Sequence, residues 1–220
     1  MVNDIWTSPL FILSSLVTLG VGLYSFVYSR IQMGRAYRRS LMTLASAVET
    51  KDVGSVGHGE RVARYVVAMC KSLGLSGREA RRFEYAAFLQ DIGNVSVPHG
   101  ILNKTSNLTQ EEFETLKQHT VVGAEMFSEI KFLKDIAPII RHHHESWDGS
   151  GYPDGLQGRD IPLGARILAV CTAYDSMMNS RAYRPRMNED EVIRQLRADM
   201  GIKYDPEIVE TFLRMQKKFR

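Results

Sequence analysis

Cysteine is nearly absent from this chain: only Cys70 and Cys171 occur among 220 residues, and both stand in apolar runs. The sequence has no CxxC pair and no cysteine–histidine spacing of the zinc-binding kind, so a thiolate zinc site is excluded. Two cysteines in apolar surroundings are typical of buried free thiols in a reducing compartment.

A strong charge of either sign is also lacking. The formal net charge is +3 at pH 7, and much of the excess lies in Arg30, Arg35, Arg38 and Arg39. The basic residues are not interleaved with aromatic residues on one expected face, so no nucleic-acid interface is indicated. The hydrophobic and charged fractions, 44% and 24%, are those of an ordinary folded protein, and the length allows one or two domains.

The N-terminal region contains no charged residue from Ile5 to Ser29. As a helix, this run would be roughly 37 Å long, enough to cross a hydrocarbon core of about 30 Å. Trp6, Tyr24 and Tyr28 lie near its ends, where aromatic rings prefer the membrane interface. A cleaved signal peptide fits poorly, because Asp4 precedes the run and neither a basic n-region nor a small-residue cleavage site is present. A buried core helix would rarely be so long and uncharged, so we expect a transmembrane helix over residues 5–29.

The arginines that follow this run predict that its C-terminal side lies in the cytoplasm, where basic flanking residues are retained. We expect a single-pass protein of the inner (cytoplasmic) membrane, with a juxtamembrane helix over residues 30–50 and a cytoplasmic domain over residues 45–220. Gly20 and Gly22 permit close approach of two such helices, so a homodimer through residues 10–50 stays open.

Apolar residues recur at helical spacing through the rest of the chain, and we find no convincing strand or internal repeat. Ser76–Glu79 and Thr109–Glu112 have the form of capping boxes, and each predicts the start of a helix. Residues 148–162 are rich in Gly, Pro and Asp and are predicted to form a loop. We therefore expect an all-α bundle, with helices from near residue 58, at about 76–92 and 109–127, around Ile136–Ile140, and at 163–180, 188–199 and 206–218.

Histidine is the chemically informative residue, because neutral imidazole is the commonest protein metal ligand near neutral pH. His142, His143 and His144 are consecutive, and His58 and His119 complete five histidines that a metal site could gather. Two adjacent residues on a helix point about 100° apart. We therefore expect His143 and His144 to serve different ions, or an ion and a substrate, rather than one ion together.

Phosphodiester hydrolysis at neutral pH is helped by two cations roughly 3.5–4 Å apart, which activate a bridging water and neutralise phosphoryl charge. Ligands for such a pair must converge from several helices. The chain offers six candidates: Glu49, His58, Asp91, His119, His143 and His144. Each one alone is a weak signal, because a lone Asp or His on a helix is more often a structural residue.

Several blocks of sequence share one resemblance. They are Gly57–Ala63, Ile101–Lys104, His143-His144-Glu145 with Trp147-Asp148-Gly149-Ser150-Gly151-Tyr152-Pro153, and Tyr204-Asp205-Pro206. On these residues the chain resembles the HD-GYP family of HD-superfamily metal-dependent phosphohydrolases, over about residues 45–215. The resemblance implies an HD-superfamily helical bundle, and active members cleave cyclic di-GMP, a bacterial second messenger.

The same resemblance implies residue roles. The metal ligands, for iron or manganese, would be the six candidates above, with Asp91 as the shared carboxylate at the catalytic centre. Arg181 and Arg184 match side chains that hold the ligand phosphates, which suits the guanidinium fork. Tyr152 would shape the mouth of the substrate site.

Three departures from the family pattern stand at Gln90, Asn94 and Thr172, where the family has His, Lys and Asp. A first metal position, held in the superfamily by residues 58, 90, 91 and 172, therefore loses two of four strong ligands to neutral oxygens that bind such metals weakly. Asn94 also removes a cation expected near the scissile phosphate. A second metal position, with Asp91, His119 and His143 or His144, survives, so we expect one ion or none rather than a bi- or trinuclear centre.

Three classes of function stay open on these residues. The first is a cyclic di-GMP phosphodiesterase with an altered metal site. The second, which the departures favour, is a module with weak or no catalysis that binds cyclic di-GMP, a related nucleotide or an unidentified protein partner. The third is a phosphohydrolase for another nucleotide. In a blander alternative, the histidines are remnants of a former site and now only pack and hydrogen-bond.

Overall fold

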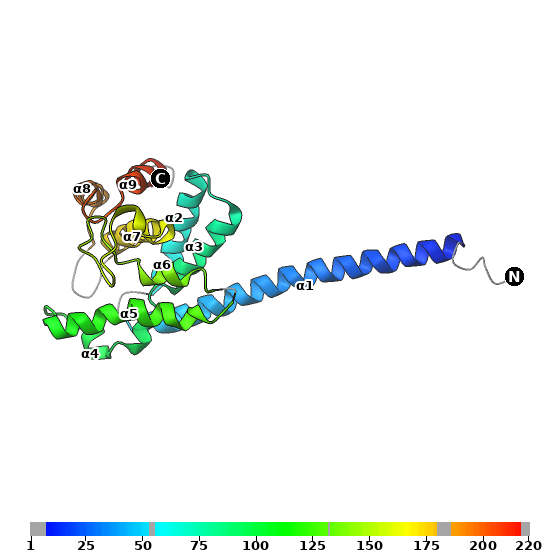
Figure 1. Cartoon of the computed structure of the whole chain (residues 1–220), viewed down its shortest axis with the longest axis horizontal. Coiled ribbons are helices and arrows are strands. Elements are labelled where there is room, and N and C mark those ends of the chain that lie inside the picture. The colour runs from blue at the N-terminus through cyan, green and yellow to red at the C-terminus, as the bar shows by residue number, and fades with distance from the viewer. Residues whose placement is uncertain (1–7, 53–55, 132, 180–185, 217–220) are drawn as a thin grey trace. The chain divides into compact units, whose positions relative to one another are not determined.

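The computed structural model describes residues 8–52, 56–131, 133–179 and 186–216. These residues form helices and no strand, apart from an isolated bridge between Met200 and Tyr204, so the all-α expectation is confirmed. The elements, shown in Figure 1, are α1 (Pro9–Glu49), α2 (His58–Ser72), α3 (Gly77–Leu89), η1 (Ile92–Ser96), α4 (His99–Leu102), α5 (Gln110–Ser128), α6 (Ala137–Arg141), η2 (Gly158–Asp160), α7 (Leu163–Met178), α8 (Glu189–Ala198) and α9 (Pro206–Gln216).

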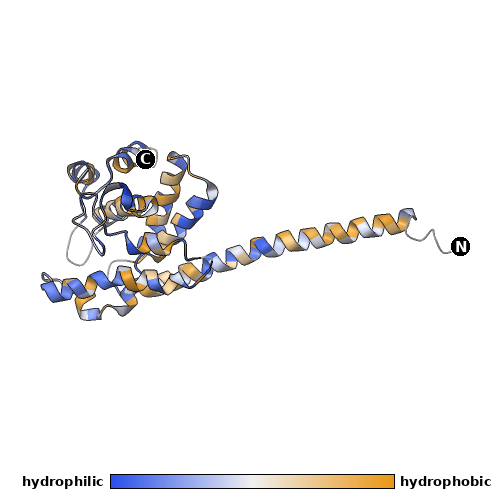
Figure 2. Ribbon diagram, viewed as in Figure 1, coloured by the Kyte–Doolittle hydropathy of each residue, from blue (hydrophilic) through white to orange (hydrophobic). Residues whose placement is uncertain are grey.

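The chain divides into two compact units, Met1–Ser40 and Leu41–Arg220. The first unit holds the apolar part of α1, coloured mostly orange and white in Figure 2. Its most apolar window has a mean hydropathy of 2.0 and is entirely unburied. By length and composition this helix could cross a membrane, and it continues unbroken to Glu49. The predicted boundaries at residues 29, 30 and 45 stay predictions.

The core of the second unit is built mainly by α2, α3, α7 and α9. Val62, Val66 and Met69 lie on the apolar face that periodicity assigns to α2, and all three are fully buried. Phe212 of α9 is fully buried in the same hydrophobic cluster. Burial of each such side chain stabilises the folded state by about 1.5–3 kcal/mol. These helices therefore hold the residues between them in fixed positions.

Capping boxes define where three helices begin. Ser76 and Glu79 start α3, and Thr109 and Glu112 start α5, as the sequence predicted. A third box, Asn188 with Glu191, starts α8 and was not foreseen. In each case the side chain at the cap accepts from a backbone N–H that would otherwise lack a partner, which fixes the helix start.

The predicted helix over residues 76–92 ends earlier than expected, at Leu89. A 3-10 segment, η1, follows it. At Gly93 a side chain would overlap the backbone carbonyl of His119, so the chain passes directly against α5 there. This close approach places η1 beside the histidine that α5 contributes. The single helical turn α4 was also not foreseen.

Candidate metal centre

Three histidines converge between α5 and the turn that follows α6. His119 lies on α5, and His143 and His144 follow His142, the first residue after α6. One nitrogen of each ring can be chosen so that all three lie within 4.8 Å of one another. His119 and His143 are buried and His144 is partly buried.

The ring nitrogens of His119 and His143 are arranged as metal ligands require. Nδ1 of His119 donates to the carbonyl oxygen of Leu116 at 2.7 Å, and Nδ1 of His143 donates to that of Ile140 at 2.6 Å. These bonds fix the tautomer that leaves a lone pair on Nε2, the usual supporting contact of a metal-binding histidine. Both Nε2 atoms are buried and have no hydrogen-bond partner. Burial, together with the neighbouring His119, lowers the pKa of His143 to about 4, so this ring is neutral at pH 7.

The expectation that His143 and His144 serve different ions rests on a geometry that is not observed. It assumed helical geometry, in which adjacent side chains diverge. The helix α6 ends at Arg141, and residues 142–144 form a turn, so the two rings lie with their centroids 4.1 Å apart. The turn therefore brings both residues to the same donor cluster as His119.

Asp91 lies between this cluster and His58. Its Oδ1 is 4.0 Å from Nε2 of His119, and its Oδ2 is 4.0 Å from Nε2 of His58. A carboxylate in this place is geometrically suited to be shared by two sites, as the resemblance implies. Three imidazoles and one carboxylate are a fitting donor set for one divalent transition metal, and the two unpartnered Nε2 atoms are the observation that supports the fit.

Three of the four residues expected at the first metal position, His58, Gln90 and Thr172, are instead joined by hydrogen bonds. Nδ1 of His58 donates to Asp175 at 2.7 Å, and its Nε2 accepts from the amide of Gln90 at 3.1 Å. The hydroxyl of Thr172 then donates to Oε1 of Gln90 at 2.8 Å. Four side chains are thus linked in series by hydrogen bonds, and we name them the Gln90 network: Asp175, His58, Gln90 and Thr172.

Arg61 anchors one end of the Gln90 network. Its guanidinium donates to both oxygens of Asp175, at 2.8 and 3.0 Å. Burial alone would raise the pKa of Asp175, but hydrogen bonds from His58 and Arg61 outweigh it and hold that pKa below its usual value. Because Asp175 stays ionised, it keeps the proton of His58 on Nδ1. The role of Arg61 was not predicted, although it lies in the block Gly57–Ala63.

Glu49 occupies a different place from the other proposed ligands. Its Oε1 accepts from the N–H of Gly59 at 2.7 Å and its Oε2 from that of Gly57 at 2.8 Å. Glu49 therefore caps the start of α2, where a carboxylate is favoured by the exposed N–H groups. Its role as a metal ligand stays a prediction.

Lys51, two residues further on, was missed. Its ammonium donates to the carbonyl oxygens of Asn94, Val95 and Val97, at 3.1, 3.0 and 2.6 Å. Three such bonds hold η1 and the residue after it in place beside Asp91. Its only sequence signal is that it stands two residues after the candidate ligand Glu49.

A cleft of about 590 Å³ opens onto the candidate metal centre. Asp91, His119 and His144 line it, together with residues 104–108 and Tyr152. The ring of Tyr152 stacks on His144 with centroids 4.9 Å apart, and burial raises its pKa. Gln90 is buried behind this surface, whereas Asn94 and Thr172 reach the lining. Arg181 and Arg184 lie outside the described residues.

Comparison with known proteins gives a consistent family. The HD domain family matches residues 42–208. The chain is 38% identical over 179 residues to the cyclic di-GMP phosphodiesterase response regulator RpfG of Xanthomonas campestris, covering 80% of this chain and 47% of that protein. It is 38% identical over 172 residues to a cyclic di-GMP phosphodiesterase of Thermotoga maritima, covering 77% and 47%. The chain thus spans about half the length of these relatives.

A solved structure with the same fold is Bd1817, an HDG"Y"P protein from Bdellovibrio bacteriovorus. It aligns with a TM-score of 0.61 at 22% identity, covering 73% of this chain and 51% of that one. Another is V-cGAP3 of Vibrio cholerae, described as a cyclic GMP-AMP specific phosphodiesterase, with a TM-score of 0.61 at 19% identity and coverage of 80% and 48%.

Proposed function

This chain belongs to the HD domain family, with HD-GYP proteins as its relatives, and on that premise we propose that it is a membrane-anchored signalling module with weak or no catalysis. The module binds cyclic di-GMP or a related cyclic dinucleotide, or docks a protein partner, in the cytoplasm. Its relatives are named as phosphodiesterases for such nucleotides, which supports this ligand class.

The observation that carries the proposal is the Gln90 network. The nitrogen with which His58 would bind a metal accepts a hydrogen bond from the amide of Gln90. The oxygen of Gln90 in turn accepts a hydrogen bond from the hydroxyl of Thr172. Gln90 is almost completely buried, so breaking these bonds to admit an ion would leave polar atoms unpaired. Without a first ion, no water can be activated between two metals.

One ion at the second metal position supports binding rather than turnover. His119, His143, His144 and Asp91 would hold it, and an iron or manganese ion there would supply a positive charge for a phosphate oxygen. Around it, Tyr152 and the loop over residues 104–108 form walls for the rest of the ligand. The cleft volume of about 590 Å³ is within the range of small-molecule sites.

Membrane anchoring is the second part of the proposal. The apolar window of α1 is long enough and sufficiently uncharged to cross a bilayer. The arginines that follow it favour a cytoplasmic location for the HD domain. Input would then reach the domain from the bilayer, a partner or a ligand.

An active phosphodiesterase with an altered metal site is the alternative function. The converging histidines and the names of the relatives favour it. Calorimetry and turnover on one sample separate the two: the full chain in detergent, loaded with manganese or iron, is titrated with cyclic di-GMP and with 3′3′-cGAMP, and each nucleotide is assayed for hydrolysis. We expect binding without cleavage. Cleavage at the rate of an intact family member would establish the alternative, and neither binding nor cleavage would overturn nucleotide binding as the function.

A further inference from the structure

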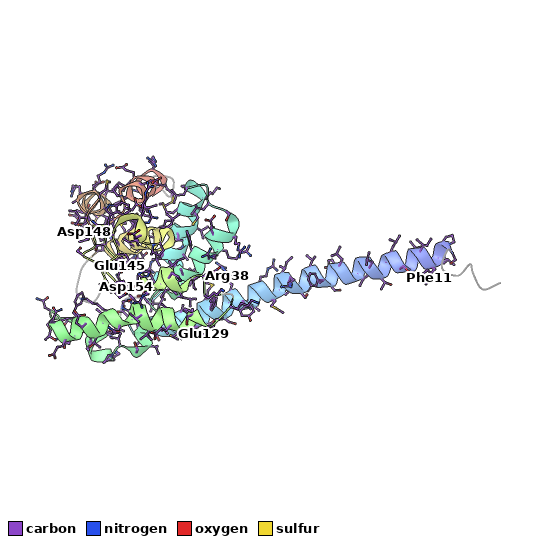
Figure 3. The ribbon with its side chains drawn as sticks, viewed as in Figure 1. Phe11, Arg38, Glu129, Glu145, Asp148 and Asp154 are labelled. Atoms are coloured by element: carbon purple, nitrogen blue, oxygen red, sulfur yellow. The ribbon has the colours of Figure 1, made fainter. Side chains whose placement is uncertain are left out.

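A second group of metal-binding side chains lies outside the candidate metal centre. His142, Glu145 and Asp154 each offer one donor atom, and these three atoms lie within 4.8 Å of one another. Glu145 and Asp154, labelled in Figure 3, belong to the segment that follows α6. None of the three residues contributes to the cluster of His119, His143 and His144.

The donor spacing suits a small tetrahedral ion. Nδ1 of His142 is 3.4 Å from Oε1 of Glu145 and 3.7 Å from Oδ2 of Asp154. Zinc binds nitrogen and oxygen ligands at about 2.0–2.2 Å, which puts neighbouring donors of a tetrahedron about 3.3–3.6 Å apart. Only small movements would therefore be needed to close these donors around zinc.

Glu145 is a buried carboxylate with an unmet requirement. Its side chain is 0% exposed, and its Oε2 has no hydrogen-bond partner. Its Oε1 accepts the N–H of Asp154 at 2.9 Å and a long hydrogen bond from Nδ1 of His142 at 3.4 Å, and neither contact reaches Oε2. A bound metal would take the place of the proton on that His142 nitrogen. An ionised carboxylate is costly to bury without a cation or full hydrogen bonding.

Arg141 does not neutralise the Glu145 carboxylate, because its guanidinium is paired with Asp154. Its Nε and Nη2 donate to the two Asp154 oxygens at 2.8 and 2.7 Å. Metal-binding carboxylates are commonly held by such outer hydrogen bonds, which fix their orientation. With two carboxylates and one guanidinium, the cluster has a net charge of about −1 when His142 is neutral, so it favours a cation.

We propose that His142, Glu145 and Asp154 form a separate site for zinc or a similar divalent transition metal, with water completing the coordination. One imidazole and two carboxylates are a donor set that such metals accept, and three protein ligands leave one position open. Bound metal would join the end of α6 to the loop two residues beyond Tyr152. It would thereby stabilise one wall of the cleft. The proposal does not depend on whether the cleft binds a nucleotide.

Zinc stoichiometry tests this site. The full chain in detergent is stripped with a chelator, equilibrated with zinc, dialysed and analysed for metal per chain. The background His119→Gln/His143→Gln removes ligands of the candidate metal centre, and in it we expect about one zinc per chain to remain. Adding His142→Ala should remove that zinc. His99→Ala in the same background is the matched control, because His99 is exposed on α4 and belongs to neither cluster, and it should leave the zinc in place.

A second measurement covers the case in which the double variant does not fold. His142→Ala and Asp154→Asn, made singly in the wild-type chain, should each lower the bound zinc by about one equivalent and reduce the visible absorption of bound cobalt(II). Unchanged zinc and unchanged cobalt spectra in both variants would overturn the proposal. Nucleotide binding is not the readout, so failure here and failure of the proposed function are distinguishable.

Discussion

The amide of Gln90 donates a hydrogen bond to Nε2 of His58 at 3.1 Å. This nitrogen is the atom through which His58 would bind a metal ion, because its Nδ1 is already committed to Asp175. Where the resembled family has a histidine ligand, Gln90 therefore does more than withhold one. It has engaged the lone pair of another.

Restoring the family residues should restore the first metal position. The variant Gln90→His/Thr172→Asp puts an imidazole at position 90 and a carboxylate at position 172. It thereby removes both the hydrogen bond from Gln90 to His58 and the one from Thr172 to Gln90. We expect the manganese content of the chain to rise by about one ion, and hydrolysis of cyclic di-GMP to appear or increase. Elemental analysis and a turnover assay measure the two effects.

Gln90→His alone is the matched control, because it leaves Thr172 without a charge to offer. With three strong ligands but no charge at position 172, it should gain less manganese than the double variant. If the double variant binds no more manganese than the wild type, the Gln90 network is not what closes the first position.

Thr172→Val should destabilise the domain although it removes only a hydroxyl. The buried Oε1 of Gln90 would lose its donor, and an unsatisfied buried acceptor costs about 1–3 kcal/mol. Thermal or urea unfolding of the metal-free chain measures the difference. Thr115→Val is the control, because Thr115 is exposed and bonds only within its own helix. Equal effects of the two substitutions would contradict a stabilising role for the network.

Metal removal should lower stability through His119 and His143. A ligand present at one hundred times its dissociation constant stabilises the folded state by about 2.7 kcal/mol. We expect added manganese to raise the melting temperature of the stripped wild type, and His119→Gln to abolish most of that rise. His99→Ala should behave as the wild type. A full manganese response in His119→Gln would remove this residue from the centre.

Gly93→Ala should disturb the candidate metal centre by displacing the backbone of α5 at His119. Its new methyl group would overlap the backbone of α5 at His119, and neither backbone can yield easily. We expect a loss of about 3 kcal/mol in unfolding free energy, with weaker manganese binding. Gly100→Ala is the control, since a side chain there meets nothing within 4 Å. A stable, metal-binding Gly93→Ala chain would show that α5 and η1 are further apart.

Leu19→Arg tests the membrane anchor. A charged residue near the middle of a transmembrane helix costs about 2.5–3.5 kcal/mol on insertion scales, so the fraction of chain in membranes should fall. Gln32→Arg, beyond the uncharged run, should stay in the membrane fraction. Fractionation of expressing cells followed by carbonate washing measures both. Loss of wild-type chain on washing would contradict anchoring.

Much of the fold could be predicted because it is encoded locally. The boxes at Ser76 and Thr109 fixed two helix starts, and apolar spacing identified the buried face of α2. The turn after Arg141 could not be predicted from spacing, because a short helix can end anywhere among similar residues. Because α6 ends early, the donor atoms of His143 and His144 lie in one cluster instead of diverging.

The candidate site was predictable in composition but not in pairing. The departures at Gln90 and Thr172 were visible, yet their mutual hydrogen bond joins residues far apart in the sequence. The capping role of Glu49 likewise depends on where α2 begins relative to α1. Such contacts follow from tertiary packing, which no local pattern specifies.

The Gln90 network also constrains how the chain could evolve. An aspartate at position 172 would face the oxygen of Gln90, so the amide would have to turn over and offer that oxygen to His58. A histidine at position 90 would lie beside Thr172, where the family pattern has an aspartate. We therefore expect each single substitution, Gln90→His or Thr172→Asp, to be less stable than both the wild-type chain and the double variant.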